Sequence, residues 1–169
     1  MDATPFELSV AVAAAPVRVE DFGAWVRPHL PAMANLASRF VGSTDRDDVV
    51  QESLTRAWRR WGTYREERGT PRVWLLAIVA DRARRHARGV ARRGIRLMPG
   101  PVVIAGDSVL DLEAAIVRLS RRQRLAVELH YYADLSVAEV ALVMGCSEGT
   151  VKSTLFDARA RLRRQLEET

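Results

Sequence analysis

The stretch from residue 136 to residue 162 constrains the fold more than any other part of the sequence. It holds two helical patterns separated only by the turn Gly145-Cys146-Ser147. Ser136 and Glu139 form a capping box for the first helix, and Ser147 can cap the second. The apolar positions of the second helix follow an i, i+4, i+7, i+11 pattern: Val151, Leu155, Ala158 and Leu162. Two helices joined by a short turn with glycine are typical of a helix-turn-helix.

The second helix of such a pair enters the DNA major groove through its N-terminal residues. Its outward positions here are Glu148, Gly149, Lys152, Ser153, Phe156 and Arg159. Lys152 is a natural phosphate or base contact, and a serine hydroxyl can bond a phosphate or a base edge. The pattern therefore predicts DNA binding, and a helical hairpin that only packs is the alternative.

The rest of the chain also predicts helices, and no strand pattern competes with them. Ser120 and Gln123 form another capping box, and Thr70-Pro71 is typical of a helix start. The segment 98–108 (MPGPVVIAGDS) has two Pro, two Gly and no helical period. We expect an all-α fold of two small helical domains joined by a short flexible linker. The expected parts are a flexible tail 1–20, domains 21–96 and 110–169, and a linker 97–109.

The net charge of +5 comes from one segment. Residues 82–109 carry seven Arg and one Asp, whereas the flanking parts are nearly neutral. A concentrated run of arginines attracts polyphosphate backbones or acidic partners. The alternative is a solvated helix end.

Composition argues against several classes of protein. One cysteine and three scattered histidines make a disulfide impossible within the chain and a structural zinc site unexpected. We expect Cys146 to be a small buried hydrophobe. No apolar run approaches the roughly 18 residues of a membrane span. No positive charge precedes the apolar N-terminal stretch, which argues against a signal peptide. We expect a cytoplasmic protein that does not insert into the membrane and needs no cofactor.

The segment DRDDVVQESLTRAW places four carboxylates beside an apolar helical stripe: Asp45, Asp47, Asp48 and Glu52. They can be catalytic, metal-binding, a protein contact or a solvated helix face. Helix spacing gives a metal ion too few converging oxygens, and no nearby His or nucleophile completes a catalytic site. Carboxylates in a first helical turn also offset the helix dipole, so Asp45 and Asp47 can be capping residues.

Four segments together resemble one family. The helix-turn-helix LSVAEVALVMGCSEGTVKSTL, with LSRRQRLAVELHYYADLS before it, is similar to region 4 of bacterial sigma factors of the sigma-70 family, extracytoplasmic-function (ECF) group. DDVVQESLTRAW resembles the region 2 motif, and RVWLLAIVADRARRHAR resembles the helix that reads the promoter −10 element. The resemblance covers about residues 22–168, in the family's order and across a short linker.

The resemblance implies a sigma factor that binds core RNA polymerase at the β′ clamp and β flap, directs it to promoter DNA and helps to melt it. An anti-sigma partner is implied as well. The implied polymerase contacts are Asp48, Gln51 and Glu52. The implied −10 contacts are Tyr64, Trp74, Arg82, Arg85 and Arg88, although Trp74 fits a core position better. The implied −35 contacts are Glu148, Gly149, Thr150, Lys152, Ser153, Phe156 and Arg159.

Three positions depart from the family pattern. Thr154 stands where an arginine is common, Asp157 where a basic residue is common, and Ala80-Asp81 where an asparagine is common. An acid on a recognition helix opposes phosphate but can accept a hydrogen bond from cytosine N4. We therefore expect weak or unusual −35 recognition.

Three rival readings stay open at this point. The first is a stand-alone helix-turn-helix regulator that binds duplex DNA without polymerase. The second is a sigma-like decoy that occupies polymerase or an anti-sigma protein without initiating. The third is a carboxylate metal enzyme, against our expectation that the chain is not an enzyme.

Overall fold

The computed structural model describes residues 19–92 and 107–167, and within them it contains only helices and turns. The first domain has helices α1 (Val19–Val26), α2 (Leu30–Ser38), α3 (Ser43–Arg60) and α4 (Pro71–Arg92). Short 3-10 turns stand at η1 (Arg27–His29), η2 (Trp61–Thr63) and η3 (Glu66–Arg68). The second domain has α5 (Asp107–Val117), α6 (Arg121–Val127), η4 (Glu128–Tyr132), α7 (Val137–Met144) and α8 (Glu148–Glu167). The all-α prediction is confirmed.

The first domain is built around α4, which packs against both α2 and α3. α4 begins as the sequence predicts, because Pro71 is its first residue and the Thr70 hydroxyl accepts a hydrogen bond from Val73 N at 3.4 Å. Its inner side is apolar, and the buried residues of α2 and α3 are apolar except Ser53, whose hydroxyl donates to Val49 O of its own helix. The buried residues include Met33, Leu36, Ala37, Val49, Ala57, Leu75, Leu76 and Val79.

The second domain depends on the caps that the sequence predicts. Both capping boxes form, with Ser120 paired to Gln123 and Ser136 paired to Glu139. The Ser147 hydroxyl accepts from Thr150 N at 3.2 Å at the start of α8. Gly145 ends α7 with φ of 63°, the left-handed conformation that a side chain makes costly. The helix-turn-helix is therefore α7 and α8.

The helix that begins at the Ser120 capping box is not regular along its whole length. It changes after Val127 into the π-helical turn η4, in which Ala133 N donates to Glu128 O at 2.9 Å. A π turn widens the helix by one residue and is common at functional sites. Here it places Glu128 inside the protein.

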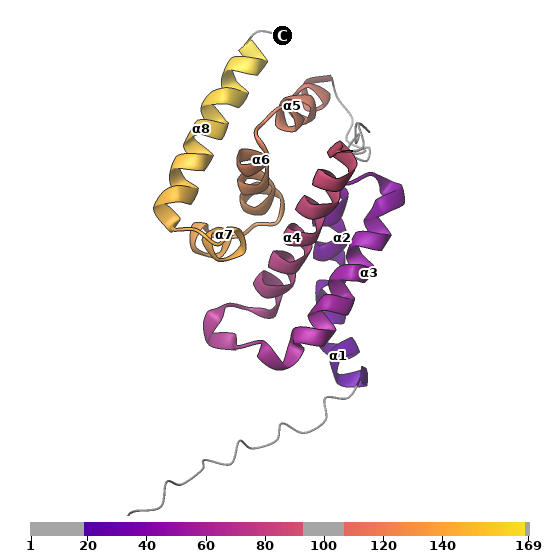
Figure 1. The fold of residues 1–169 in the computed structure, drawn as a ribbon. Helices are drawn as coiled ribbons and strands as arrows, with labels where there is room; N and C mark the ends of the chain where they lie inside the picture. Colours follow the sequence, from indigo (N-terminus) through magenta and orange to yellow (C-terminus); the bar gives the residue numbers. More distant parts are fainter. Residues whose placement is uncertain (1–18, 93–106, 168–169) are drawn as a thin grey trace, which may run out of the picture.

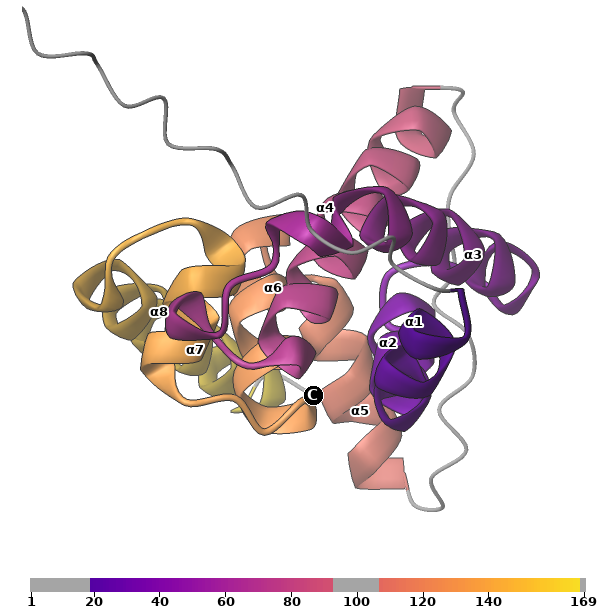
Figure 2. The same ribbon diagram turned by 90° about the horizontal axis from the view of Figure 1, so that it is seen from below.

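The two domains pack against each other through α4 and α7, and their buried apolar residues form one continuous cluster. Figure 1 shows α4 between the two groups of helices, and Figure 2 shows α1–α3 on the side opposite α7 and α8. We call this packing the closed arrangement. The expected tail (1–20) and linker (97–109) lie mostly outside the described residues. α1 begins at Val19, within the range expected for the tail, and α5 begins at Asp107, within the range expected for the linker.

Candidate functional sites

The acidic side of α3 is partly occupied by the protein itself. Glu52 forms an ion pair with Arg82 of α4, and the Asp45 carboxylate lies 3.1 Å from His86 Nε2. Asp48 and Gln51 are exposed, and neither side chain has a hydrogen bond or ion pair with the described part of the chain. Of the three residues that the resemblance assigns to polymerase, two are open to a partner and one is engaged within the domain.

The arginines of α4 do not share one environment. Arg82 pairs with Glu52, and Arg85 pairs with Asp81 on its own helix at 3.1 Å. Arg88 is exposed and lines a cavity between the two domains. A spacing of three residues turns the side chains by roughly 60° per step on a helix of 3.6 residues per turn. The three arginines that the resemblance assigns to the −10 element therefore fan around α4, and the closed arrangement does not bring them together.

Tyr64 and Trp74 lie in an aromatic cluster at one end of the first domain. Their ring centroids are 5.6 Å apart, and Trp25 packs edge-on against both, at 5.2 Å and 5.9 Å. The Tyr64 hydroxyl donates to Gly69 O at 3.1 Å and fixes the loop before α4. Trp74 is half-buried against the core and also lines a cavity of about 300 Å³ that reaches α7. Both aromatics are thus held in place by packing and still reach the surface.

The N-terminal half of α8 presents most of its predicted DNA-facing residues to solvent. Lys152, Ser153 and Arg159 are exposed, and Phe156 is 65% exposed although it is aromatic. The exposed set also contains Glu148 and Gly149, and Thr150 is half-buried. These side chains therefore form one outward surface, which we call the α8 face.

The structure explains one departure from the family pattern. Thr154 is nearly buried, and its hydroxyl donates to Thr150 O at 2.6 Å. Its side chain therefore lies on the inner side of α8 and does not face outward. Asp157 is exposed beside Phe156 and brings a negative charge to the α8 face.

A buried polar network joins the two domains, and sequence reasoning missed it. Arg39, the residue that follows α2, lies 2.6 Å from the Glu128 carboxylate and 2.7 Å from that of Glu113. The Arg124 guanidinium donates to the backbone carbonyl of Arg39, and Arg72 donates to Ala133 O at 2.6 Å. The available signal was a carboxylate inside the apolar run LAVELHYY, because a buried acid needs a partner.

Burial sets the electrostatics of this network. It raises the pKa of the Glu128 carboxyl, an effect that the neighbouring guanidiniums of Arg39 and Arg124 oppose. The pKa of Arg39 is raised, because burial, which alone lowers it, is outweighed by hydrogen bonds and charge from Glu128 and Glu113. The pKa of Tyr132 is raised to about 12 by burial and by its hydrogen bond to Glu113. The ion pairs therefore hold charged groups inside the closed arrangement.

Two further observations bear on the class of protein. Among the described residues no three or more His, Cys, Asp or Glu side chains gather to hold a metal ion. No helix in residues 19–92 or 107–167 is long and apolar enough to cross a membrane.

Comparison with known proteins agrees with this arrangement of domains. Residues 25–93 match sigma-70 region 2, and residues 110–162 match sigma-70 region 4. The ECF RNA polymerase sigma factor SigL of Mycobacterium tuberculosis is 30% identical over 152 residues, which cover 83% of this chain and 85% of SigL. The RNA polymerase sigma-E factor of Streptomyces coelicolor is 31% identical over 154 residues, 88% of this chain and 87% of that protein.

A solved structure has the same fold. The sigma factor RpoE of Bartonella quintana, in complex with the anti-sigma factor NepR, superposes with a TM-score of 0.70 at 27% identity, covering 88% of this chain and 98% of RpoE. The region order, the helix-turn-helix and these similarities agree. The chain belongs to the sigma-70 family, as an ECF-type sigma factor.

Proposed function

We propose that this sigma factor binds core RNA polymerase through the exposed side of α3, at the β′ clamp, with Asp48 and Gln51 as the direct contacts. The observation that carries the proposal is that these two side chains are exposed and unpaired within the described residues, whereas Asp45 and Glu52 beside them are engaged. A carboxylate on a helix surface can form a bidentate pair with an arginine of a partner, which gives the contact its specificity. Glu52 then acts chiefly by fixing α4 to α3.

The second part of the proposal concerns promoter DNA. The α8 face would enter the major groove of the −35 element, with Lys152 and Arg159 near phosphates or base edges. Region 4 as a whole would also contact the β flap. Asp157 would weaken phosphate contacts and favour a base that can donate, such as cytosine.

The −10 element would be read by α4 and the loop before it. Tyr64 and Trp74 offer aromatic surfaces for an unstacked base, and Arg85 and Arg88 offer cations for the backbone. Trp74 faces a cavity that α7 borders in the closed arrangement. The two domains would therefore separate before both promoter elements are engaged.

The same geometry suggests how the factor is held inactive. A protein that favours the closed arrangement keeps the domains from reaching their separate sites, and the anti-sigma factor bound to the similar RpoE supports such a partner here. The work of a sigma factor is binding and positioning, so we expect no covalent chemistry by the chain itself and a cytoplasmic location with the polymerase.

Reconstituted transcription tests this function. Core RNA polymerase with the purified chain would be given a library of promoter fragments, and run-off transcripts would be sequenced. We expect transcripts that start at a fixed distance from a shared pair of sequence elements. A chain that binds polymerase but yields none would be a decoy, and specific duplex binding without polymerase would support a stand-alone regulator.

A further inference from the structure

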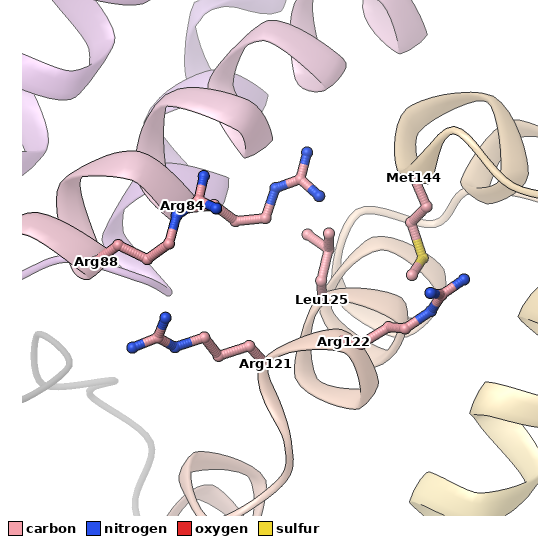
Figure 3. A pocket seen from close by; sticks show the side chains of 6 residues that line it. All are labelled: Arg84, Arg88, Arg121, Arg122, Leu125 and Met144. Carbon is pink, nitrogen blue, oxygen red and sulfur yellow. The ribbon is translucent and has the colours of Figure 1, made fainter. Parts of the chain in front are cut away.

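Four arginines from the two domains surround one cavity in the closed arrangement. The cavity has a volume of about 270 Å³ and is lined by Arg84, Arg88, Arg121, Arg122, Leu125 and Met144. Figure 3 shows the side chains of Arg84 and Arg88 reaching in from α4, with that of Arg121 entering from the side of α6. The side chain of Arg122 lies next to Met144. The site therefore exists only where the two domains meet.

The charges in this cavity are not balanced by the described residues. Among the described residues no carboxylate lines it, and none of the four guanidiniums forms an ion pair. Elsewhere in the domain contact, Arg39 and Arg124 face carboxylates, and Arg72 donates to Ala133 O. Arg84 uses its Nε to donate to Ala80 O at 3.1 Å, which leaves its terminal nitrogens for another acceptor. Four like charges brought together by closure oppose that closure unless an anion joins them.

The chemistry of the walls indicates which anion fits. Guanidinium groups bind phosphate in a bidentate geometry, and several of them facing one small space match an anion that carries several charges on few atoms. A single peptide carboxylate offers one charge to four cations. Leu125 and Met144 add an apolar wall, against which a nucleoside can lie.

We infer that this cavity binds a small anion with a di- or triphosphate group, either free or carried by a nucleotide. The bound anion bridges α4 and α6 and stabilises the closed arrangement, because a ligand stabilises the state that binds it. By linkage, closing the domains strengthens anion binding to the same extent. One further consequence rests on the proposed function: the anion and promoter DNA compete for Arg88.

The experiment titrates inorganic tripolyphosphate into the full-length chain by calorimetry at constant ionic strength. The test variant Arg84→Gln/Arg121→Gln removes one guanidinium from each wall. The control Arg59→Gln/Arg163→Gln removes the same charge from exposed positions on α3 and α8 that do not line the cavity and lie outside the α8 face. Losing two charge-assisted contacts should weaken binding about a hundredfold in the test variant, and the control should stay within about threefold. If the test variant fails to fold, Arg88→Gln/Arg122→Gln takes its place.

Further probes identify the ligand chemistry. ATP that binds more tightly than tripolyphosphate assigns the apolar wall to a nucleoside, and equal affinities assign the site to the polyphosphate alone. Both results support the inference when the test variant loses binding. Equal weakening in the control variant, or equal binding of sulfate, would reduce the effect to general charge attraction and overturn it. A hexaglutamate peptide that binds more tightly than tripolyphosphate, and loses binding in the test variant, would overturn it in favour of an acidic protein segment.

This binding measurement does not depend on transcription. Failure of the proposed sigma activity would leave the calorimetric result standing, and failure of anion binding would leave polymerase binding untouched. The two claims are therefore tested separately.

Discussion

Arg39 Nε lies 2.6 Å from the Glu128 carboxylate, and this pair joins the C-terminal end of α2 in the first domain to the π turn of the second. The Glu128 side chain is 0% exposed, and that of Arg39 is 10% exposed. Arg39 also lies over the Tyr132 ring, 4.1 Å from its centroid. These contacts form only while the domains are closed, so the pair is specific to the closed arrangement.

Removing Arg39 should open the protein. Arg39→Met leaves Glu128 as a buried charge and disfavours closure by roughly 3 kcal/mol, the low end for breaking a buried pair, because Arg124 Nε remains 3.8 Å away. Small-angle scattering should show a larger radius of gyration at unchanged helix content. The double variant Arg39→Met/Glu128→Leu removes both charges and should close again. An unchanged radius in Arg39→Met would mean that the pair does not hold the domains.

The same variant should respond to pH. Burial raises the pKa of Glu128 above its usual 4.5, so the closed state binds its proton more tightly than the open state. Closure is then favoured below the usual pKa and weakens as the pH rises through the raised pKa. Without Arg39 the pKa of Glu128 rises further. The radius of gyration of the Arg39→Met variant should therefore increase more from pH 4.5 upward than that of the wild type. Arg39→Met/Glu128→Gln lacks the titrating carboxyl and should lose this added dependence.

Two neighbouring positions on α8 test the core of the second domain. Leu155 is 4% exposed, so Leu155→Asp places an unpaired charge inside and should lower the free energy of unfolding by at least about 3 kcal/mol. Phe156→Asp adds the same charge on the exposed side and should change it by about 0.5 kcal/mol or less. Urea denaturation measures both. Similar losses in the two variants would mean that the faces of α8 are assigned the wrong way round.

Lys152 tests the contact of α8 with DNA. Its side chain is exposed, and its only ion pair in the described chain is a loose one with Glu148, at 3.9 Å. If it neutralises a phosphate, Lys152→Ala should weaken promoter binding by the holoenzyme for all sequences and lower the salt slope by about 1. Filter binding at several salt concentrations measures this. A loss confined to one base pair at the −35 element would instead make Lys152 a base contact.

The fold was accessible from the sequence because its signals are local. The capping boxes at Ser120 and Ser136, and the cap at Thr70, each lie within three residues of their partners, and helical periodicity marked the core positions Val151 and Leu155. These interactions depend on neighbours in the chain, so the pattern of residue types is enough to predict them.

The domain contact was not accessible in the same way. Arg39 and Glu128 are 89 residues apart, and no local pattern pairs them. The π turn that buries Glu128 also breaks the helical period that sequence reasoning assumed. For the same reason the pairing of Glu52 with Arg82 was missed, because it needs the placement of α3 against α4. Contacts between residues far apart in the sequence therefore determine which of the predicted site residues are paired within the protein and which are open to a partner.

The central claim is that the exposed side of α3 binds core RNA polymerase, and one co-purification tests it most directly. Asp48→Arg reverses an exposed, unpaired charge without disturbing the Glu52–Arg82 pair, and Asp47→Arg makes the same change one position away on the same helix, where the side chain is 72% exposed. We expect the wild type and Asp47→Arg to co-purify with core polymerase, and folded Asp48→Arg to be lost. Retention of Asp48→Arg, or absence of the folded wild type from the complex, would contradict the account.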